Sequence, residues 1–198
     1  AVNGHVRRAA AGLVAAACIA SMLSACAPGN AAVGDTQSAD DAVAHIMKDR
    51  NSLNVAMVGS QDVQSDRMAM EALKTGGLKP IYLPVSGTVD AQAAARQGVK
   101  DMTQRMADII VIAGMDASGA NHDGWYEMLD APRQAGIPVV LLDPISMPTD
   151  SALFAATLKT NDRMTDAKPI ADVVAAIANN DPHDREIIVT TVKRKTRG

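Results

Sequence analysis

Short apolar runs alternate with amphipathic stretches along most of the chain, and the alternation predicts strands and helices in turn. The run "DIIVIAG", residues 108–114, has an unbroken apolar centre, which is typical of a strand covered on both faces. A strand of this kind belongs in the middle of a sheet. Further strands are expected at 53–59, 79–85, 137–143 and, in shorter form, 153–158.

The stretches between these runs carry apolar residues at helical spacing. After Thr88, one face of the expected helix holds Ala91, Ala95, Val99, Met102 and Met106. Other helices are expected at 65–75 and at 124–135, the latter interrupted or restarted near Pro132, and around 170–177. A lead-in helix is expected to begin at Ser38.

Strands that alternate with helices favour a parallel sheet with helices on both faces. We therefore predict a three-layer, doubly wound α/β body over residues 38–192, with the strands ordered second, first, third, fourth, fifth. Pro84 points to a sheet edge for the second strand. The last apolar run, "EIIVTTV" at 186–192, either adds a strand at the edge or remains unpaired.

The N-terminal region has the three parts of an export signal: Arg7 and Arg8, an apolar segment over 9–23, and small residues after it. The apolar segment is shorter than the roughly 20 residues needed to cross a membrane. The segment Leu23-Ser24-Ala25-Cys26 resembles the lipobox of bacterial lipoprotein signals. The resemblance implies removal of residues 1–25, acylation of Cys26 and a lipid-anchored place on the extracytoplasmic face of the cell membrane. The alternative is a free thiol at Cys26 in an ordinary signal peptide or apolar helix.

Residues 26–37 are rich in small side chains without an apolar period, which predicts a flexible tether. A tether of this length spans roughly 17 to 20 Å. The other cysteine, Cys18, lies in the segment that would be removed, so the mature chain has no partner for a disulfide. The basic tail at 193–198 is either solvated or drawn to anionic headgroups.

The body resembles the N-terminal lobe of type I periplasmic (sugar) binding proteins of ABC importers. The likeness is carried by "LNVAMVG", "ADIIVIAGMD" and "AGIPVVLLD", and more weakly by "LKTNDRMTDAKPIADVVAAIA", within residues 53–192. The family clamps its ligand between two lobes, and this chain has room for one. Either the last elements fold back onto the single sheet, or a partner lobe completes the cleft.

In open α/β sheets, ligands lie beyond the carboxyl ends of the strands. That rule places Gln61 and Asp62 after the first strand, Asp116 after the third and Asp143 after the fourth. A carboxylate there can accept hydrogen bonds from two sugar hydroxyls, which makes these residues candidate ligand contacts. The alternative is that Asp62 and Asp143 only cap turns or helix starts.

Aromatic residues that could stack on a sugar ring are scarce. The loop after the first strand has none, and Pro144 stands where the family often has arginine after the aspartate. Trp125, with Tyr126 beside it, is the remaining candidate platform for a ring, the alternative being that both are packing residues.

Other functions find little support in the sequence. The net charge is −3 and no long basic run precedes the last six residues, which argues against nucleic-acid binding. The loop "DASGANHD", residues 116–123, lacks the spacing of a calcium loop, and its single histidine has no partner at metal spacing. The serine of "VGSQD" has no nucleophile elbow around it. We expect no enzyme activity, metal or cofactor.

Two functional hypotheses remain. The first is a lipid-anchored solute-binding-like protein linked to ABC-type carbohydrate import, with a small polar solute and a permease or partner lobe as its partners. The second is a single-lobe interaction or scaffold lipoprotein that has lost small-molecule binding. The ligand and the oligomeric state are left open.

Overall fold

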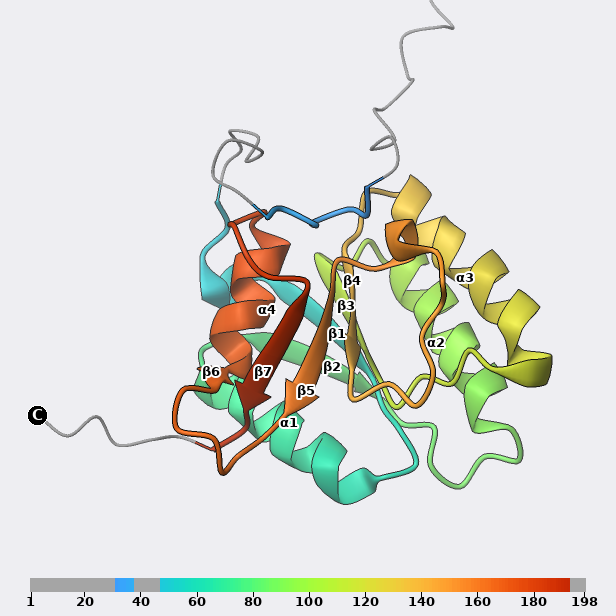
Figure 1. Ribbon diagram of the computed structural model, residues 1–198, viewed down its shortest axis with the longest axis horizontal. Helices are drawn as coiled ribbons and strands as arrows, with labels where there is room; N and C mark the ends of the chain where they lie inside the picture. The colour runs from blue at the N-terminus through green and yellow to red at the C-terminus, as the bar shows by residue number, and fades with distance from the viewer. Residues whose placement is uncertain (1–30, 38–46, 193–198) are drawn as a thin grey trace, which may run out of the picture.

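The computed structural model describes residues 31–37 and 47–192 of the chain, and the larger range forms one sheet with helices on both faces (Figure 1). Each strand is short, and β1, β3 and β4 end where the hydrophobic run in the sequence ends. The strands are β1 (Asn54–Val58), β2 (Lys79–Leu83), β3 (Ile109–Ala113), β4 (Val139–Leu142), β5 (Ala156–Thr160), β6 (Lys168–Pro169) and β7 (Glu186–Thr190).

The seven strands form a sheet of order β2-β1-β3-β4-β5-β7-β6. Every pairing between neighbours is parallel. The predicted order of the first five strands is confirmed, as is the edge position of β2. The last apolar run does not remain unpaired: β7 lies beside β5, and the two-residue β6 ends the sheet on that side.

Two helices cover each face of the sheet. Helices α1 (Val63–Thr75) and α4 (Ile170–Ala178) pack on one face, and α2 (Ala91–Gln104) and α3 (His122–Gln134) pack on the other (Figure 1). The predicted three-layer α/β class is confirmed. Short 3-10 turns occur at Arg50–Ser52, Gly119–Asn121 and Ser151–Leu153.

The expected interruption of α3 near Pro132 is wrong, because the helix runs unbroken to Gln134. Pro132 lies in its last turn and is buried. A proline there removes one backbone hydrogen bond close to the end of the helix, where few bonds remain to be lost.

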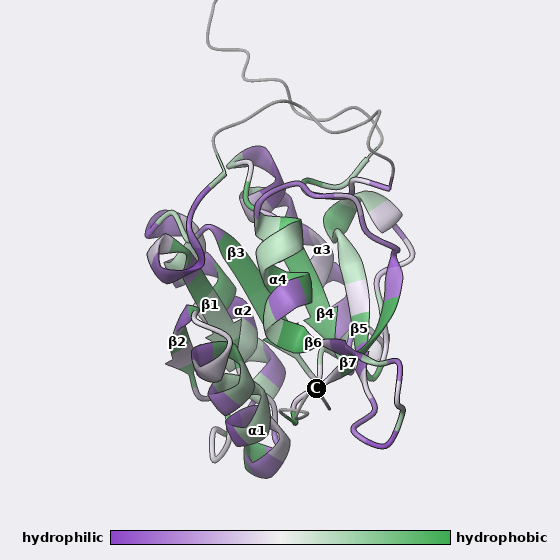
Figure 2. Cartoon of the chain, turned by 90° about the vertical axis from the view of Figure 1, so that its left-hand side faces the viewer, coloured by the Kyte–Doolittle hydropathy of each residue, from purple (hydrophilic) through white to green (hydrophobic). Residues whose placement is uncertain are grey.

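The core divides into two hydrophobic clusters, one on each side of the sheet. All five residues of β3 are buried: Ile109 and Val111 belong to the cluster under α1 and α4, while Ile110 and Ile112 belong to that under α2 and α3. Figure 2 shows the central strands coloured as hydrophobic. Burying each such side chain stabilises the fold by about 1.5–3 kcal/mol, so the sheet contributes a large share of the stability.

Residues 31–37, here called the N-terminal strap, pack against the body, which corrects the expectation that the flexible tether extends to Gln37. The strap crosses the end of the sheet where the strands begin (Figure 1). Ala32 and Thr36 are buried. The carboxylate of Asp35 pairs with the guanidinium of Arg185, and its side chain is only 8% exposed.

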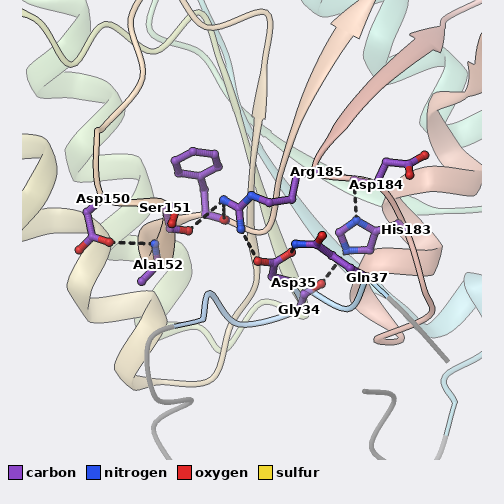
Figure 3. Close-up of polar contacts among 10 residues, drawn as sticks. Gly34, Asp35, Gln37, Asp150, Ser151, Ala152, His183, Asp184 and Arg185 are labelled. Carbon is purple, nitrogen blue, oxygen red and sulfur yellow. Dashed lines mark hydrogen bonds and ion pairs between the residues drawn. The ribbon is translucent and has the colours of Figure 1, made fainter. Parts of the chain in front are cut away.

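Backbone contacts fix the same segment. The backbone N–H of His183 donates to the carbonyl of Thr36 at 2.7 Å. His183 Nε2 lies 2.7 Å from the carbonyl oxygen of Gly34, as Figure 3 shows. Gly34 has a φ of +78°, and a Cβ there would lie 2.8 Å from Cβ of Pro138. Glycine is therefore required for the strap to lie this close to the body.

Several expectations concern residues outside the described ranges. These are the signal peptide and lipidation at Cys26, the lead-in helix from Ser38, and the basic tail at 193–198. Within the part of the chain that the structure describes, no helix has the length and apolar character needed to span a membrane.

Candidate functional site

A cavity of about 490 Å³ opens at the end of the sheet where the parallel strands terminate, opposite the N-terminal strap. Six strands, β1, β2, β3, β4, β5 and β7, contribute to its wall through the residues that follow or end them. It is lined by Gly59, Ser60, Gln61, Asp62, Ser65, Asp66, Met68, Ala69, Val85, Ala91, Gln92, Ala95, Ala113, Gly114, Leu142, Asp143, Ile145, Thr160, Asp162 and Thr191.

Asp66, in the first turns of α1, organises the wall beyond β1. Its side chain points inward and the residue is 2% exposed. Oδ2 accepts hydrogen bonds from the backbone N–H of Ser60 at 2.7 Å and from the hydroxyl of Tyr82 at 2.8 Å, and Oδ1 accepts from the Ser60 hydroxyl at 2.9 Å. Three donors thus reach both oxygens and hold the loop after β1 against the helix.

This network leaves no space at Gly59. A Cβ there would lie 2.5 Å from the hydroxyl of Tyr82 and 2.7 Å from Oδ2 of Asp66. Burial, and then the hydrogen bond to the Asp66 carboxylate, raise the pKa of Tyr82 to about 12. Tyr82 therefore stays a protonated donor throughout the physiological pH range.

Asp62 lies on the exposed rim and caps α1. Oδ1 accepts from the backbone N–H groups of Gln64 and Ser65, both at 3.1 Å, and Oδ2 accepts from the Ser65 hydroxyl at 2.7 Å. The hydroxyl of Ser65, and next its backbone N–H, hold the pKa of Asp62 below its usual value. The capping role considered from the sequence is present, and the same carboxylate also lines the cavity.

Asp143 follows β4 in a left-handed backbone conformation, with a φ of +45°. Its Oδ1 accepts from the backbone N–H of Thr160 at 2.8 Å, which ties the end of β4 to the end of β5. A non-glycine residue rarely adopts this conformation, and such strained positions are concentrated at functional sites. The side chain is exposed at the cavity wall.

Gln92, at the start of α2, is fixed on three sides. Its Nε2 donates to the carbonyl of Gly114 at 3.3 Å, while Oε1 accepts from the indole N–H of Trp125 at 2.9 Å and from the backbone N–H of Asp116 at 3.1 Å. The amide plane is therefore held in one orientation at the cavity wall.

The expectation that Trp125 contacts a ligand is wrong. Its side chain is 0% exposed and belongs to the core cluster under α2 and α3, with the guanidinium of Arg96 lying 5.8 Å from the ring centroid. The packing alternative is the correct one. Trp125 acts on the cavity only indirectly, through its hydrogen bond to Gln92.

Asp116 is not among the residues that line the cavity. Its Oδ1 accepts from the backbone N–H of Ser118 at 3.0 Å and from the Ser118 hydroxyl at 2.6 Å. These contacts, the hydroxyl first, lower the pKa of Asp116. Asp116 therefore stabilises the loop to which it belongs. Of the residues predicted from the sequence, Gln61, Asp62 and Asp143 line the cavity, and Asp116 does not.

Asp162 and Thr191 line the cavity just after the ends of β5 and β7, and the sequence analysis did not identify them. Asp162 accepts from the Thr190 hydroxyl at 2.7 Å and from the backbone N–H and hydroxyl of Thr191 at 2.7 and 2.8 Å. Burial alone would raise the pKa of Asp162, but these hydrogen bonds together hold it below its usual value. The sequence signal was the position of Asp162 just after the fifth strand.

The ionisable side chains that line the cavity are all carboxylates, from Asp62, Asp66, Asp143 and Asp162. Within the described ranges, no group of three or more histidine, cysteine, aspartate or glutamate side chains is arranged to hold a metal ion. The arrangement presents hydrogen-bond acceptors to a ligand and surrounds them with alkyl side chains such as Met68 and Leu142.

No protein-family model matches the chain, and no curated protein matches it. Among solved structures, the chain is similar to a Burkholderia pseudomallei protein described as pilus assembly-related, with 16% identity, a TM-score of 0.45, and coverage of 71% of this chain and 99% of that one. A Mycobacterium smegmatis protein in complex with β-D-fucofuranose is similar at 15% identity and a TM-score of 0.46, with coverage of 70% and 54%. A galactofuranose binding protein is similar at 18% identity and a TM-score of 0.43, with coverage of 69% and 56%.

The descriptions of two of these three neighbours name furanose sugars. The chain spans about half the length of these two proteins. The sugars in these descriptions are ligands of those two proteins and are not thereby assigned to this chain.

Proposed function

We propose that the protein binds a small polar solute in the cavity at the carboxyl ends of its strands. The observation that carries the proposal is the cavity itself, whose volume of about 490 Å³ falls in the range of small-ligand pockets. Its polar groups are held in place before any ligand arrives, as the contacts of Asp66 and Gln92 show. Such preorganisation reduces the entropy lost on binding.

A carbohydrate suits this surface. Among the described residues, Gln61 makes no hydrogen bond or ion pair, and Oδ2 of Asp143 accepts none, so both are available to ligand hydroxyls. The alkyl side chains of Met68, Ala91 and Leu142 can pack against the C–H face of a sugar ring. The described lobe lines the ligand from one side and leaves the rest of it in water, so for this lobe alone we expect dissociation constants no tighter than the micromolar range, about −8 kcal/mol.

The proposal includes the cellular setting expected from the sequence: acylation at Cys26, an extracytoplasmic location, and delivery of solute to an ABC-type importer. The N-terminal strap packs at the amino ends of the strands, and the cavity opens at their carboxyl ends (Figure 1). Anchoring through Cys26 would therefore leave the cavity facing away from the membrane, accessible to solute and to a partner lobe.

Calorimetry and thermal-shift measurements against a panel of pentoses, hexoses and polyols test the binding proposal. We expect at least one solute to bind, and Asp143→Asn to weaken it by about ten- to a hundredfold, because hydrogen bonds to a charged acceptor contribute about 1.5–3 kcal/mol. Glu127→Gln, on the exposed surface of α3, is the control and should bind normally. If no solute binds, and partner capture by the Asp143→Asn protein equals that of the wild type, the interaction-lipoprotein hypothesis replaces this one.

Anchoring is tested separately by mass spectrometry of membrane-extracted protein, in which the mature N-terminal cysteine should carry acyl mass. A Cys26→Ala protein that remains uncut and equally membrane-bound would contradict the lipoprotein assignment.

A further inference from the structure

The charge of the cavity wall restricts the ligand further. Of its lining residues, Asp62, Asp66, Asp143 and Asp162 are ionisable and acidic, and no lysine, arginine or histidine is among them. Low-dielectric walls concentrate the field of such like charges in a cleft. An anionic ligand would therefore be repelled, whereas a cationic one would be attracted.

These carboxylates have no cationic partner in the described part of the chain. The ion pairs found there use Asp35, Asp108, Asp123, Asp172 and Asp184, none of which lines the cavity. The cavity carboxylates are held instead by hydroxyl and backbone N–H donors, which carry no charge.

Asp66 is the clearest example of a cavity carboxylate without a positively charged partner among the described residues. It is 98% buried, lines the cavity, and is held by the neutral donors Ser60 and Tyr82. Buried charges in proteins are usually paired with an opposite charge. Hydrogen bonds lower the pKa of Asp62 and of Asp162, so these two carboxylates are negatively charged at neutral pH.

We propose that the solute bound in this cavity carries an ammonium group, an amino sugar being the member of that class that also offers hydroxyls to Gln61 and a ring face to the alkyl side chains. This inference rests on the proposed function and names the class of ligand for the same site. The ammonium lies between the rim carboxylates of Asp62 and Asp143 and provides the countercharge that the described residues do not supply.

The experiment uses sugars of one ring type that differ in charge. Calorimetry on the mature protein compares glucosamine with glucose, N-acetylglucosamine and glucuronate, and galactosamine with galactose, at low and at high salt. We expect each amino sugar to bind at least about tenfold more tightly than its neutral counterpart, glucuronate not to bind, and the preference to shrink as salt screens the charges.

Two isosteric variants locate the effect. Asn is a good helix cap and tolerates a left-handed backbone, so Asp62→Asn and Asp143→Asn should both fold. Each should weaken binding of the amino sugar about tenfold more than it weakens binding of the neutral sugar, and the preference should fall by that factor. Glu127→Gln, away from the cavity, should leave the preference unchanged.

The outcomes separate the two proposals. Equal affinity for neutral and amino sugars, or tighter binding of glucuronate, overturns the ammonium inference and leaves solute binding standing. An amino-sugar preference that neither variant reduces also overturns it. Failure of every sugar to bind contradicts the proposed function and this inference with it.

Discussion

Arg185 should hold the N-terminal strap to the body, and its replacement by methionine tests that reasoning. The guanidinium pairs with Asp35 of the strap, donates to the carbonyl oxygens of Ser151 and Phe154 at 2.9 and 3.1 Å, and lies 5.1 Å from the Phe154 ring centroid (Figure 3). Methionine keeps the packing of the side-chain stem and removes all four interactions.

The magnitude follows from burial. The Asp35 side chain is 8% exposed and the Arg185 side chain 26%, so the pair is only weakly screened by water. Removing one partner of a buried pair costs about 3–5 kcal/mol, because the other charge stays buried. For a chain of this size each kcal/mol shifts the Tm by about 2–4 °C, so Arg185→Met should lower the Tm by about 6–20 °C.

Arg50→Met is the matched control. Arg50 also pairs with a carboxylate, Asp172, at 2.7 Å, but the two side chains are 45% and 52% exposed. Exposed pairs of this kind contribute about 0–1 kcal/mol. Urea unfolding followed by circular dichroism gives the free energies for both variants and for the double-mutant cycle with Asp35→Asn.

The cycle decides the question. If Arg185 and Asp35 stabilise the fold through each other, the loss in the double variant is smaller than the sum of the single losses by at least 1 kcal/mol or so. Additive losses, or a loss at Arg185 no larger than at Arg50, would show that the strap is not held by this pair.

Three further predictions concern the cavity. Gly59→Ala would bring a methyl group within 2.7 Å of Oδ2 of Asp66, so the loop after β1 should shift, and both the Tm and solute affinity should fall. Trp125→Phe removes the N–H that orients Gln92 and should weaken solute binding more than it lowers the free energy of unfolding, as measured by calorimetry and urea unfolding. Because the folded-state pKa of Asp162 is lowered, its contribution is present above its unfolded pKa of about 4 and is lost as pH falls through the folded value. Acid unfolding curves of Asp162→Asn should therefore be flatter below about pH 4 than those of the wild type.

Much of the fold could be predicted from the sequence because buried parallel strands leave a simple signal. The run 108–114 is apolar at every central position since both faces of β3 are covered, and its neighbours in the sheet repeat the pattern. The strand-end rule then located Gln61, Asp62 and Asp143 without any contact being known.

The rest depended on contacts between distant segments. The strap is rich in small residues, like a linker, and it packs through contacts with distant residues, such as that of Asp35 with Arg185, which lies 150 positions later in the chain. From the sequence Trp125 could have faced a ligand or the core, and its complete burial in the cluster under α2 and α3 decided between them. No local pattern in the sequence records such pairings.

Asp66 shows how a site residue can be missed and what would reveal it. The strand-end rule looks at loops, whereas Asp66 lies one turn into α1, four residues after the cap at Asp62 and therefore on the same side of the helix. That side faces the loop after β1, where Gly59 lets the backbone and Tyr82 approach the carboxylate. Asp66, four positions beyond the cap and preceded by the glycine that follows β1, thus faces the strand end instead of solvent. The helix that follows such a strand contributes to the cavity wall as much as the loop does, and its first turns should be searched together with the loop.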